Sequence, residues 1–405
     1  MLQNRGFLRV SCVLATLCLA SSLKAQFLLN SDSAFKAGSP NSGRIWGYAF
    51  GDYYYKTHSD SLKRGGANQY TGIPANRSAF QFRRIYLGYD YNISRKFSAE
   101  LLLAAEDNFP AGNPVSSASP SGDLLQNNKL SFYIKLANIR WKNIWKGTDL
   151  VVGEVAPPTF PLLTEKIWGY RSVERTISDI RRLPSYDLGA ELQGRFDAKG
   201  NFGYNLMVGN SNQAKPESDN FKTFYGDVYA YFLDRRLVFD LYADYQRLNW
   251  TSQFHHSRNM VKAFAAYTTP SLTVGVEAFI NHGKQDVIGI LGSQQDTLSA
   301  DAEGISLYVH GDIQPGRLGY FARFDAYNPD VEYDAARYPK YTGLSSTYEP
   351  NSREQFITAG LDFTPAHNVH FMPNIWYTRY KSQQGLNNTD HDLVYRMTFY
   401  FIFGK

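Results

Sequence analysis

The amino-acid sequence predicts an all-β protein, a 16-stranded antiparallel β-barrel that crosses a membrane. Three observations indicate this fold class. Apolar and polar residues alternate with a period of two in roughly sixteen segments, and the joins between these segments are alternately short and long. Beyond the N-terminal segment, no apolar run approaches the roughly 18–20 residues that a membrane helix needs. Helical membrane spans are therefore excluded.

The C-terminal segment HDLVYRMTFYFIFGK shows the alternation most clearly. Leu393, Tyr395 and Met397 begin a series that continues with Phe399, Phe401 and Phe403, whereas Arg396 and Thr398 lie on the opposite parity. Successive side chains of a strand point to opposite faces. One face is thus almost wholly apolar, and the other mixes Arg, Thr and Tyr. A soluble strand that turns its apolar face to a core has the same alternation, so this segment alone does not distinguish it from a membrane strand.

Similar segments recur along the chain, most of them near the 9–11 residues of a tilted membrane strand. In the segment at 130–141 the parity breaks near Asn138, which predicts a bulge or a strand end there. The predicted strands are 44–56, 79–92, 96–106, 130–141, 149–155, 187–197, 201–209, 221–233, 236–249, 260–268, 271–281, 303–312, 317–327, 353–364, 368–380 and 391–403.

The joins between the strands distinguish a membrane barrel from a sandwich. The short joins NISRK, DAKGN, LDRR, TTPS, DIQPGR and TPAHN contain the residues that tight turns require. An up-and-down barrel has short periplasmic turns at one end and long extracellular loops at the other, whereas a sandwich has no reason to alternate the two. The long joins are 57–78, 107–129, 156–186, 282–302, 328–352 and 381–390.

The N-terminus has the pattern of a secretory signal peptide, predicted as residues 1–25. Basic residues precede a short apolar stretch, and Ala25 precedes the predicted cleavage point. Both cysteines lie inside this segment, so the mature chain has none. A short N-terminal segment, 26–43, would then lead into the barrel, 44–405. The mature chain keeps 39 Lys and Arg against 37 Asp and Glu, and it has no basic stripe that would indicate nucleic acid as a partner.

Aromatic residues make up 15% of the chain, with 29 Tyr and 27 Phe. Several lie near segment ends, as in the aromatic girdles at membrane interfaces. Aromatic residues also favour strands in general, so the assignment of any single one to a girdle stays open. The girdle candidates are Trp46, Tyr53, Tyr54, Tyr55, Trp141, Trp145, Trp250 and Trp376.

Motifs for catalysis are not evident, and we expect no enzyme activity, no cofactor and no metal site. The sequence has no nucleophile elbow, phosphate-binding glycine loop or H-E-x-x-H motif. His255 and His256 are adjacent but lack a nearby third ligand, and the loop aspartates lack the spacing of a calcium site.

The third long join contains most of the basic residues that could act on a solute. Arg171, Glu174 and Arg175 are spaced as on a helix, and ISDIRR continues at similar spacing, which predicts a short helix. The segment is either an outer loop with ordinary salt bridges or a loop folded into the lumen. Its apolar stretch PTFPLL favours the second, because this stretch would be exposed to water in an outer loop and a sixteen-stranded lumen is otherwise wide. Inside the lumen, the basic side chains would narrow the pore and attract anions. The candidate constriction residues are Lys166, Arg171, Glu174, Arg175, Arg181 and Arg182.

The lumen parity carries further charges, and taken as a whole this wall is more acidic than the loop. Anion preference is therefore a weaker prediction than the pore itself. The candidate lumen-facing residues are Arg84, Arg195, Arg323, Arg396, Glu191, Glu277 and Asp325.

Two stretches carry a family resemblance: FQFRRIYLGYDYNISRKFSAELLL, and GEVAPPTF followed by WGYRSVERTISDIRRLPSYDLGAEL. They resemble outer-membrane porins related to the phosphate-selective porins O and P, and the chain looks similar to Bacteroidetes outer-membrane proteins. The resemblance implies a trimeric channel for small anions or other hydrophilic solutes. It also implies a third loop that constricts the pore with Arg171, Arg175, Arg181 and Arg182. The lysine cluster of the phosphate-selective members has no counterpart, because Lys166 is the only lysine in this loop.

The sequence thus predicts an outer-membrane porin for passive diffusion of small hydrophilic solutes. Its expected surroundings are the lipid bilayer and lipopolysaccharide, and a homotrimer is expected by analogy. A plugged or substrate-specific channel for hydrophobic or oligosaccharide ligands is one alternative. A secreted soluble protein that binds glycans through its aromatic residues is the other.

Overall fold

The computed structural model describes residues 40–65, 69–106, 125–126, 129–130, 132–211, 213, 220–250, 254–345, 352–383 and 388–404. The predicted signal peptide and most of the predicted segment 26–43 lie outside these residues, as does most of the predicted loop 107–129. None of the helices in the described part of the chain is long and apolar enough to cross a membrane.

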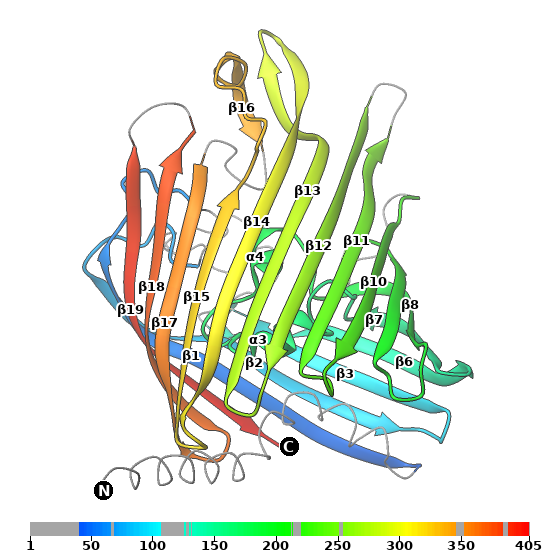
Figure 1. Ribbon diagram of the computed structural model, residues 1–405. Helices are drawn as coiled ribbons and strands as arrows, with labels where there is room; N and C mark the ends of the chain where they lie inside the picture. The colour runs from blue at the N-terminus through cyan, green and yellow to red at the C-terminus, as the bar shows by residue number, and fades with distance from the viewer. Residues whose placement is uncertain are drawn as a thin grey trace, which may run out of the picture.

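Sixteen strands of the described chain form a closed antiparallel barrel, as predicted (Figure 1). Each pairs with its neighbours in sequence, and β1 pairs with β19 from Gly47–Phe403 to His58–Leu393, which closes the wall. The wall strands are β1 (Ser42–His58), β2 (Arg77–Asn92), β3 (Phe97–Glu106), β6 (Tyr133–Trp145), β7 (Thr148–Val155), β8 (Asp187–Arg195), β9 (Phe202–Gly209), β10 (Thr223–Phe232), β11 (Leu237–Trp250), β12 (His255–Thr268), β13 (Leu272–Leu291), β14 (Gln294–Gln314), β15 (Leu318–Asn328), β17 (Ser352–Ala366), β18 (Val369–Ser382) and β19 (Thr389–Phe403).

The remaining described elements are short. Strands β4 (Leu125–Gln126) and β5 (Lys129–Leu130) pair only with each other, and β16 (Tyr341–Ser345) pairs with the outer end of β13. The helices are α3 (Thr164–Trp168) and α4 (Ile177–Arg181), with a 3₁₀ turn, η1, at Tyr338–Lys340. Both α-helices belong to the join between β7 and β8.

The alternation in the last strand has the predicted meaning. Tyr395 and Met397 are 47% and 43% exposed on the outside of the barrel, while Val394 and Thr398 are fully buried inside it. The outer parity is therefore the apolar one, which in a membrane protein contacts lipid. A closed wall also leaves no strand edge with unpaired backbone N–H and C=O groups, and such groups are not tolerated in the hydrocarbon core of a membrane.

In strand β6, the alternation of side chains between the inner and outer faces shifts earlier along the chain than predicted. Leu102 pairs with Leu136 and Leu103 pairs with Ile134, so Lys135 is the extra residue of a bulge. Lys135 and Leu136 are consequently both buried inside the barrel, and the strand continues past Asn138. The predicted break near Asn138 is therefore wrong by three residues.

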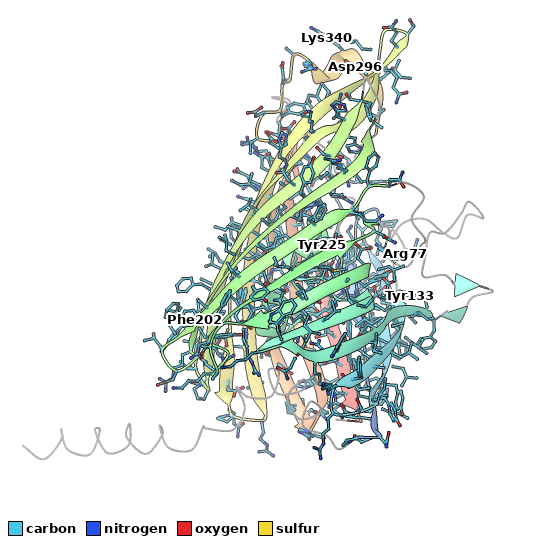
Figure 2. The ribbon with its side chains drawn as sticks, turned by 90° about the vertical axis from the view of Figure 1, so that its right-hand side faces the viewer. Arg77, Tyr133, Phe202, Tyr225, Asp296 and Lys340 are labelled. Atoms are coloured by element: carbon cyan, nitrogen blue, oxygen red, sulfur yellow. The ribbon has the colours of Figure 1, made fainter. Side chains whose placement is uncertain are left out.

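The predicted long loop 282–302 is instead a hairpin. Strands β13 and β14 remain paired to Leu291–Gln294, with a register shift between Gly283 and Val287. Figure 2 shows this hairpin, near Asp296, and the turn near Lys340 at the top, above the ends of the other strands, with Phe202 near the opposite rim. In the sequence these residues look like a polar loop. In the structure they also pair with β16, which adds a third strand to the hairpin.

The girdle assignment is only partly correct. Tyr53, Tyr55, Trp141 and Trp145 are exposed on the outer face. Three candidates lie inside instead: Tyr54 and Trp376 are buried in the lumen, and Trp46 lines an internal cavity. The side chain of Trp250 lies outside the described residues. Inside the barrel, Tyr54 and Trp376 pack with Tyr70 and Ile73, which belong to the join between β1 and β2.

Candidate functional site: a loop folded into the barrel

Residues 156–186 leave the wall after β7 and return to it at β8, and their helices lie within the ring of strands (Figure 1). The two ends of the segment are tied together, because Thr159 Oγ1 donates a hydrogen bond to Pro184 O at 2.8 Å. Helix α3 ends at Gly169, whose φ of +71° is a left-handed conformation that glycine adopts without strain. The predicted helix over ISDIRR is α4, whereas Arg171 to Arg175 form turns.

Apolar side chains attach the loop to one half of the wall. Leu163, Trp168 and Val173 pack in one buried cluster with the wall residues Tyr231, Val238, Phe264, Tyr308, Phe321 and Met372. Phe160, Ile177 and Leu183 pack in a second cluster that includes Tyr242, Met260 and Phe279. Each buried side chain of this size contributes about 1.5–3 kcal/mol. These contacts hold the loop against β10 to β15 and, through Met372, against β18.

Arginines of the wall satisfy loop carbonyls that no helix uses. Arg83 Nη1 donates to Ser172 O and Val173 O at 3.0 and 3.2 Å, and Arg396 Nη2 donates to Val173 O at 3.0 Å. Arg323 donates to Arg175 O. Buried backbone carbonyls without partners would destabilise such a loop, so these three arginines permit its turns to lie inside the barrel.

Two arginines of the loop form ion pairs with acidic residues of the wall. Arg181 binds Glu354 of β17 through two hydrogen bonds of 3.2 and 2.7 Å, and its guanidinium lies 3.9 Å from the ring centre of Tyr327. Arg182 binds Asp244 of β11 at 2.6 Å. Paired, bidentate charges of this kind fix geometry as well as charge.

Glu174 is the acidic anchor of the loop. Its Oε2 accepts hydrogen bonds from Trp376 Nε1 at 3.1 Å and Gln69 Nε2 at 3.2 Å. Burial would raise the pKa of this carboxyl, but the charges of Arg83, Arg175 and Arg396 outweigh burial and lower its pKa to about 2. Glu174 is therefore ionised at any ordinary pH.

Arg171 lies at the middle of the loop between two loop carboxylates. It binds Glu165 and Asp179, the latter at 2.8 Å, and Arg175 approaches the same Asp179 at 3.5 Å. The segment thus folds its own charges into a network. A network of this kind is more rigid than isolated surface pairs.

Two cavities lie on either side of this network. One, of about 330 Å³, is lined near the short-turn rim by Arg44, Asp90, Glu100, Arg140 and other residues of β1 to β8. The other, of about 540 Å³, is lined toward the long-loop rim by Arg84, Glu106, Asp187, Arg258 and their neighbours. Arg171 and Ser185 line both cavities. Arg171 and Ser185 therefore lie where the two cavities adjoin, next to the β1–β8 wall.

The six candidate constriction residues occupy different places. Lys166 and Arg171 line the first cavity, and Arg171, Arg175 and Arg182 line the second. Arg181 and Glu174 line neither of these two cavities and are anchors instead.

Most candidate lumen charges are buried inside the barrel and paired or near other charges. Arg84 binds Glu106 at 3.1 Å, Arg323 binds Asp325, and Arg396 donates to Asn374 at 2.8 Å. Glu191 accepts a hydrogen bond from Gln193 and Glu277 is buried in the wall. Arg195 differs, because it is exposed at the short-turn end of β8.

Sequence inspection missed the wall partners of the loop. Arg83 and Lys135 are buried and polar, and neither was a candidate. Glu354 and Asp244 are 173 and 62 residues from the arginines they bind, so no local pattern pairs them. The alternation along the strands was the one available signal, because it places Glu354 and Asp244 on the inward positions of their strands.

No family model matches the chain, and no curated protein matches it. Solved structures do. It is similar to the outer-membrane channel DcaP of Acinetobacter baumannii (TM-score 0.63, 10% identity, covering 90% of this chain and 98% of that one). It is also similar to OmpT of Vibrio cholerae (TM-score 0.53, 9% identity, 90% and 99% covered) and to OmpF of Salmonella typhi in complex with daunomycin (TM-score 0.54, 10% identity, 89% and 98% covered).

Identities of this size bear on the fold alone. The closed antiparallel wall agrees with the fold of these channels. A barrel with an apolar outer face is stable only in lipid. The chain therefore has the fold of outer-membrane porins, and its apolar outer face fits a lipid bilayer.

Proposed function

We propose that this protein is a porin that lets small hydrophilic solutes diffuse passively across the outer membrane. The observation that carries the proposal is the inward loop, whose apolar clusters pack mainly against β10–β15 and which leaves two cavities along the β1–β8 side. A loop that narrows a sixteen-stranded lumen without filling it sets a size limit for solutes.

We infer a weak preference for anions. The side chains that line the two cavities include nine Arg and Lys and seven Asp and Glu. Every arginine of the loop has an acidic partner, so the excess positive charge is small. Selectivity of this origin weakens as salt screens the charges.

Within the constriction we assign two roles. Arg171, Arg175 and Lys166 act on the passing solute, because they line the cavities. Arg181, Arg182 and Glu174 mainly hold the loop in place through Glu354, Asp244 and Trp376. The second group influences conduction through the position of the loop.

Reconstitution in planar bilayers tests the proposal. Purified protein is expected to give stepwise conductance with a reversal potential slightly on the anion side in a KCl gradient. A folded barrel that gives no conductance would contradict the proposal and favour the plugged, substrate-specific channel. Reversal on the cation side would contradict the anion preference alone.

The resemblance to phosphate-selective porins suggests a second measurement. Lys166 is the only lysine in the inward loop, so we propose that phosphate passes as an ordinary anion. Millimolar phosphate should then leave chloride conductance unchanged. A block of chloride current by phosphate would instead favour phosphate selectivity.

We further propose a homotrimer. A solved OmpT structure of Vibrio cholerae described as the trimer form matches this chain with a TM-score of 0.51 at 9% identity, and it covers 90% of this chain. The mass of the detergent-solubilised protein, measured by sedimentation with detergent correction, should equal three chains. A mass of one chain would overturn this assembly.

A further inference from the structure

The seam where the barrel closes brings together three side chains that can bind a metal. His58 is the last residue of β1, and Asp390 and His391 lie at the start of β19, on the rim opposite to the short turns. One ligand atom from each of the three lies within 4.8 Å of the other two. Their side chains are between 23% and 44% exposed, so an ion can reach them from solvent.

A bulge in β1 places His58 at this position. The register shifts between Lys56, which pairs with Val394, and His58, which pairs with Leu393. Residues directly opposite each other in an antiparallel pair share a face, so His58 lies on the face of Leu393 and His391, whereas Lys56 is buried inside beside Asp392. The two imidazoles stack as a result, with 3.9 Å between ring centres.

The separations are close to those of a metal site. His58 Nε2 and His391 Nδ1 lie 3.7 and 3.8 Å from the same oxygen, Asp390 Oδ1. Ligands about 2.0–2.2 Å from a tetrahedral zinc ion are about 3.4 Å apart, so each of these two imidazole–carboxylate pairs needs to close by only a few tenths of an ångström.

The neighbouring hydrogen bonds prepare two of the ligands. His58 Nδ1 lies 2.8 Å from His391 O, and because a carbonyl only accepts, Nδ1 carries the proton and Nε2 has the lone pair. Asp390 Oδ2 accepts a hydrogen bond from Ser61 N at 2.8 Å, and Oδ1 accepts one from His391 N at 2.9 Å. Such contacts orient ligands in metal sites.

We propose that His58, Asp390 and His391 bind a divalent transition-metal ion of the kind that prefers imidazole, with zinc as the probe, and that solvent completes the coordination. An ion lies in the plane of an imidazole that binds it, and the two rings are parallel within 5°. The His391 ring must therefore turn about its Cβ–Cγ bond on binding. The bound ion then links the first strand to the last where the wall closes.

Zinc titration tests the site. Untagged, detergent-solubilised protein treated with EDTA and dialysed should take up one equivalent of Zn²⁺ in a calorimeter. His58→Ala and His391→Ala should each weaken binding by at least about tenfold, since even the loss of a partner outside the ligand set costs about 10–100-fold. His282→Ala is the matched control, because His282 is equally exposed (44%) and contacts Asp301 but has no second imidazole in that pair.

A second readout separates binding from folding. Zn²⁺ should raise the temperature at which the folded band is lost on electrophoresis in the wild type and in His282→Ala, and should not raise it in the two site variants. The proposal is overturned if the wild type takes up no Zn²⁺, or if His58→Ala/His391→Ala binds it as the wild type does. Displacement of Zn²⁺ by equal Ca²⁺ would also overturn it, because calcium prefers oxygen ligands.

Discussion

The two sides of the barrel lumen receive side chains by the same alternation, yet they differ in what those side chains meet. On the β10–β15 side, Tyr231, Phe264 and Phe321 are covered by the inward loop. On the β1–β8 side, Arg44, Glu100 and their neighbours line a cavity. We call these the covered side and the open side.

The difference shows that the alternation along a strand determines which face a side chain points to, but not what the side chain contacts there. On the covered side, inward aromatic residues such as Tyr231 and Phe264 pack with Leu163 and Trp168 of the loop, next to buried charges such as Asp240 and Lys262. Inward residues on the open side are mixed and charged, because they meet water. The loop therefore determines both where the barrel has a core and where it keeps open cavities.

Removing the loop should have the largest effect on this comparison. If residues 161–183 are replaced by a short Gly-Ser linker, the covered side opens, and single-channel conductance should rise severalfold because the lumen cross-section grows. Shortening the β13–β14 hairpin by residues 289–296 is the control, since these residues lie beyond the wall. Equal conductance in the wild type and the loop variant would mean that the loop does not narrow the pore.

Breaking one anchor should have the next largest effect. Arg181→Ala leaves Glu354 buried without its partner, which costs about 3–5 kcal/mol. The temperature at which the folded band is lost should fall, and the current should become noisy as the loop moves. Arg181→Met with Glu354→Leu, which removes both charges, should recover much of the stability. A single variant as stable as the wild type would show that the pair does not hold the loop.

Acid should weaken the same attachment through Glu174. Its pKa of about 2 in the folded state lies below the ordinary 4.5, so its contribution is complete above pH 4.5 and is lost as the pH falls toward 2. The shift corresponds to about 3 kcal/mol. Glu174→Gln should be less stable at neutral pH and should lose this part of the acid dependence. Identical profiles of stability against pH for both proteins would contradict the assignment.

The smallest effect is expected on the open side, from a single charge. Arg171→Gln removes the positive charge shared by both cavities and leaves Glu165 and Asp179 in place. The preference for anions over cations should fall by about 1 kcal/mol, which corresponds to about fivefold in the ratio of anion to cation permeability. Glu165→Gln should shift the reversal potential in the opposite direction. Shifts of the same sign would mean that the route does not pass Arg171.

Much of the wall was predictable because its rule is local. The parity of Tyr395 and Met397, the sixteen strands and the short turns follow from backbone geometry, which acts on neighbours in sequence. The inward loop was also predictable, from an apolar stretch with no place in water. The extended β13–β14 hairpin was not, because its pairing with β16 depends on residues about 50 positions away.

Site residues were predictable by type but not by partner. Arg171 and Arg181 were both candidates for the constriction, yet one lines cavities while the other binds Glu354 at 2.7 Å. Trp46 and Trp376 were expected at membrane interfaces and instead lie inside: Trp46 lines a cavity, and Trp376 packs with Tyr70 of the β1–β2 join and donates a hydrogen bond to Glu174 of the inward loop.

The sequence by itself determined a membrane wall of alternating strands, with tight turns at one rim and longer joins at the other, because period-two patterning and turn chemistry are properties of short stretches. Only the tertiary structure decided which arginines hold the loop and which face the route, and only it brought His58 to His391 across 333 positions. Those outcomes depend on closure of the barrel, which places distant residues side by side and sets how far each charge is from water.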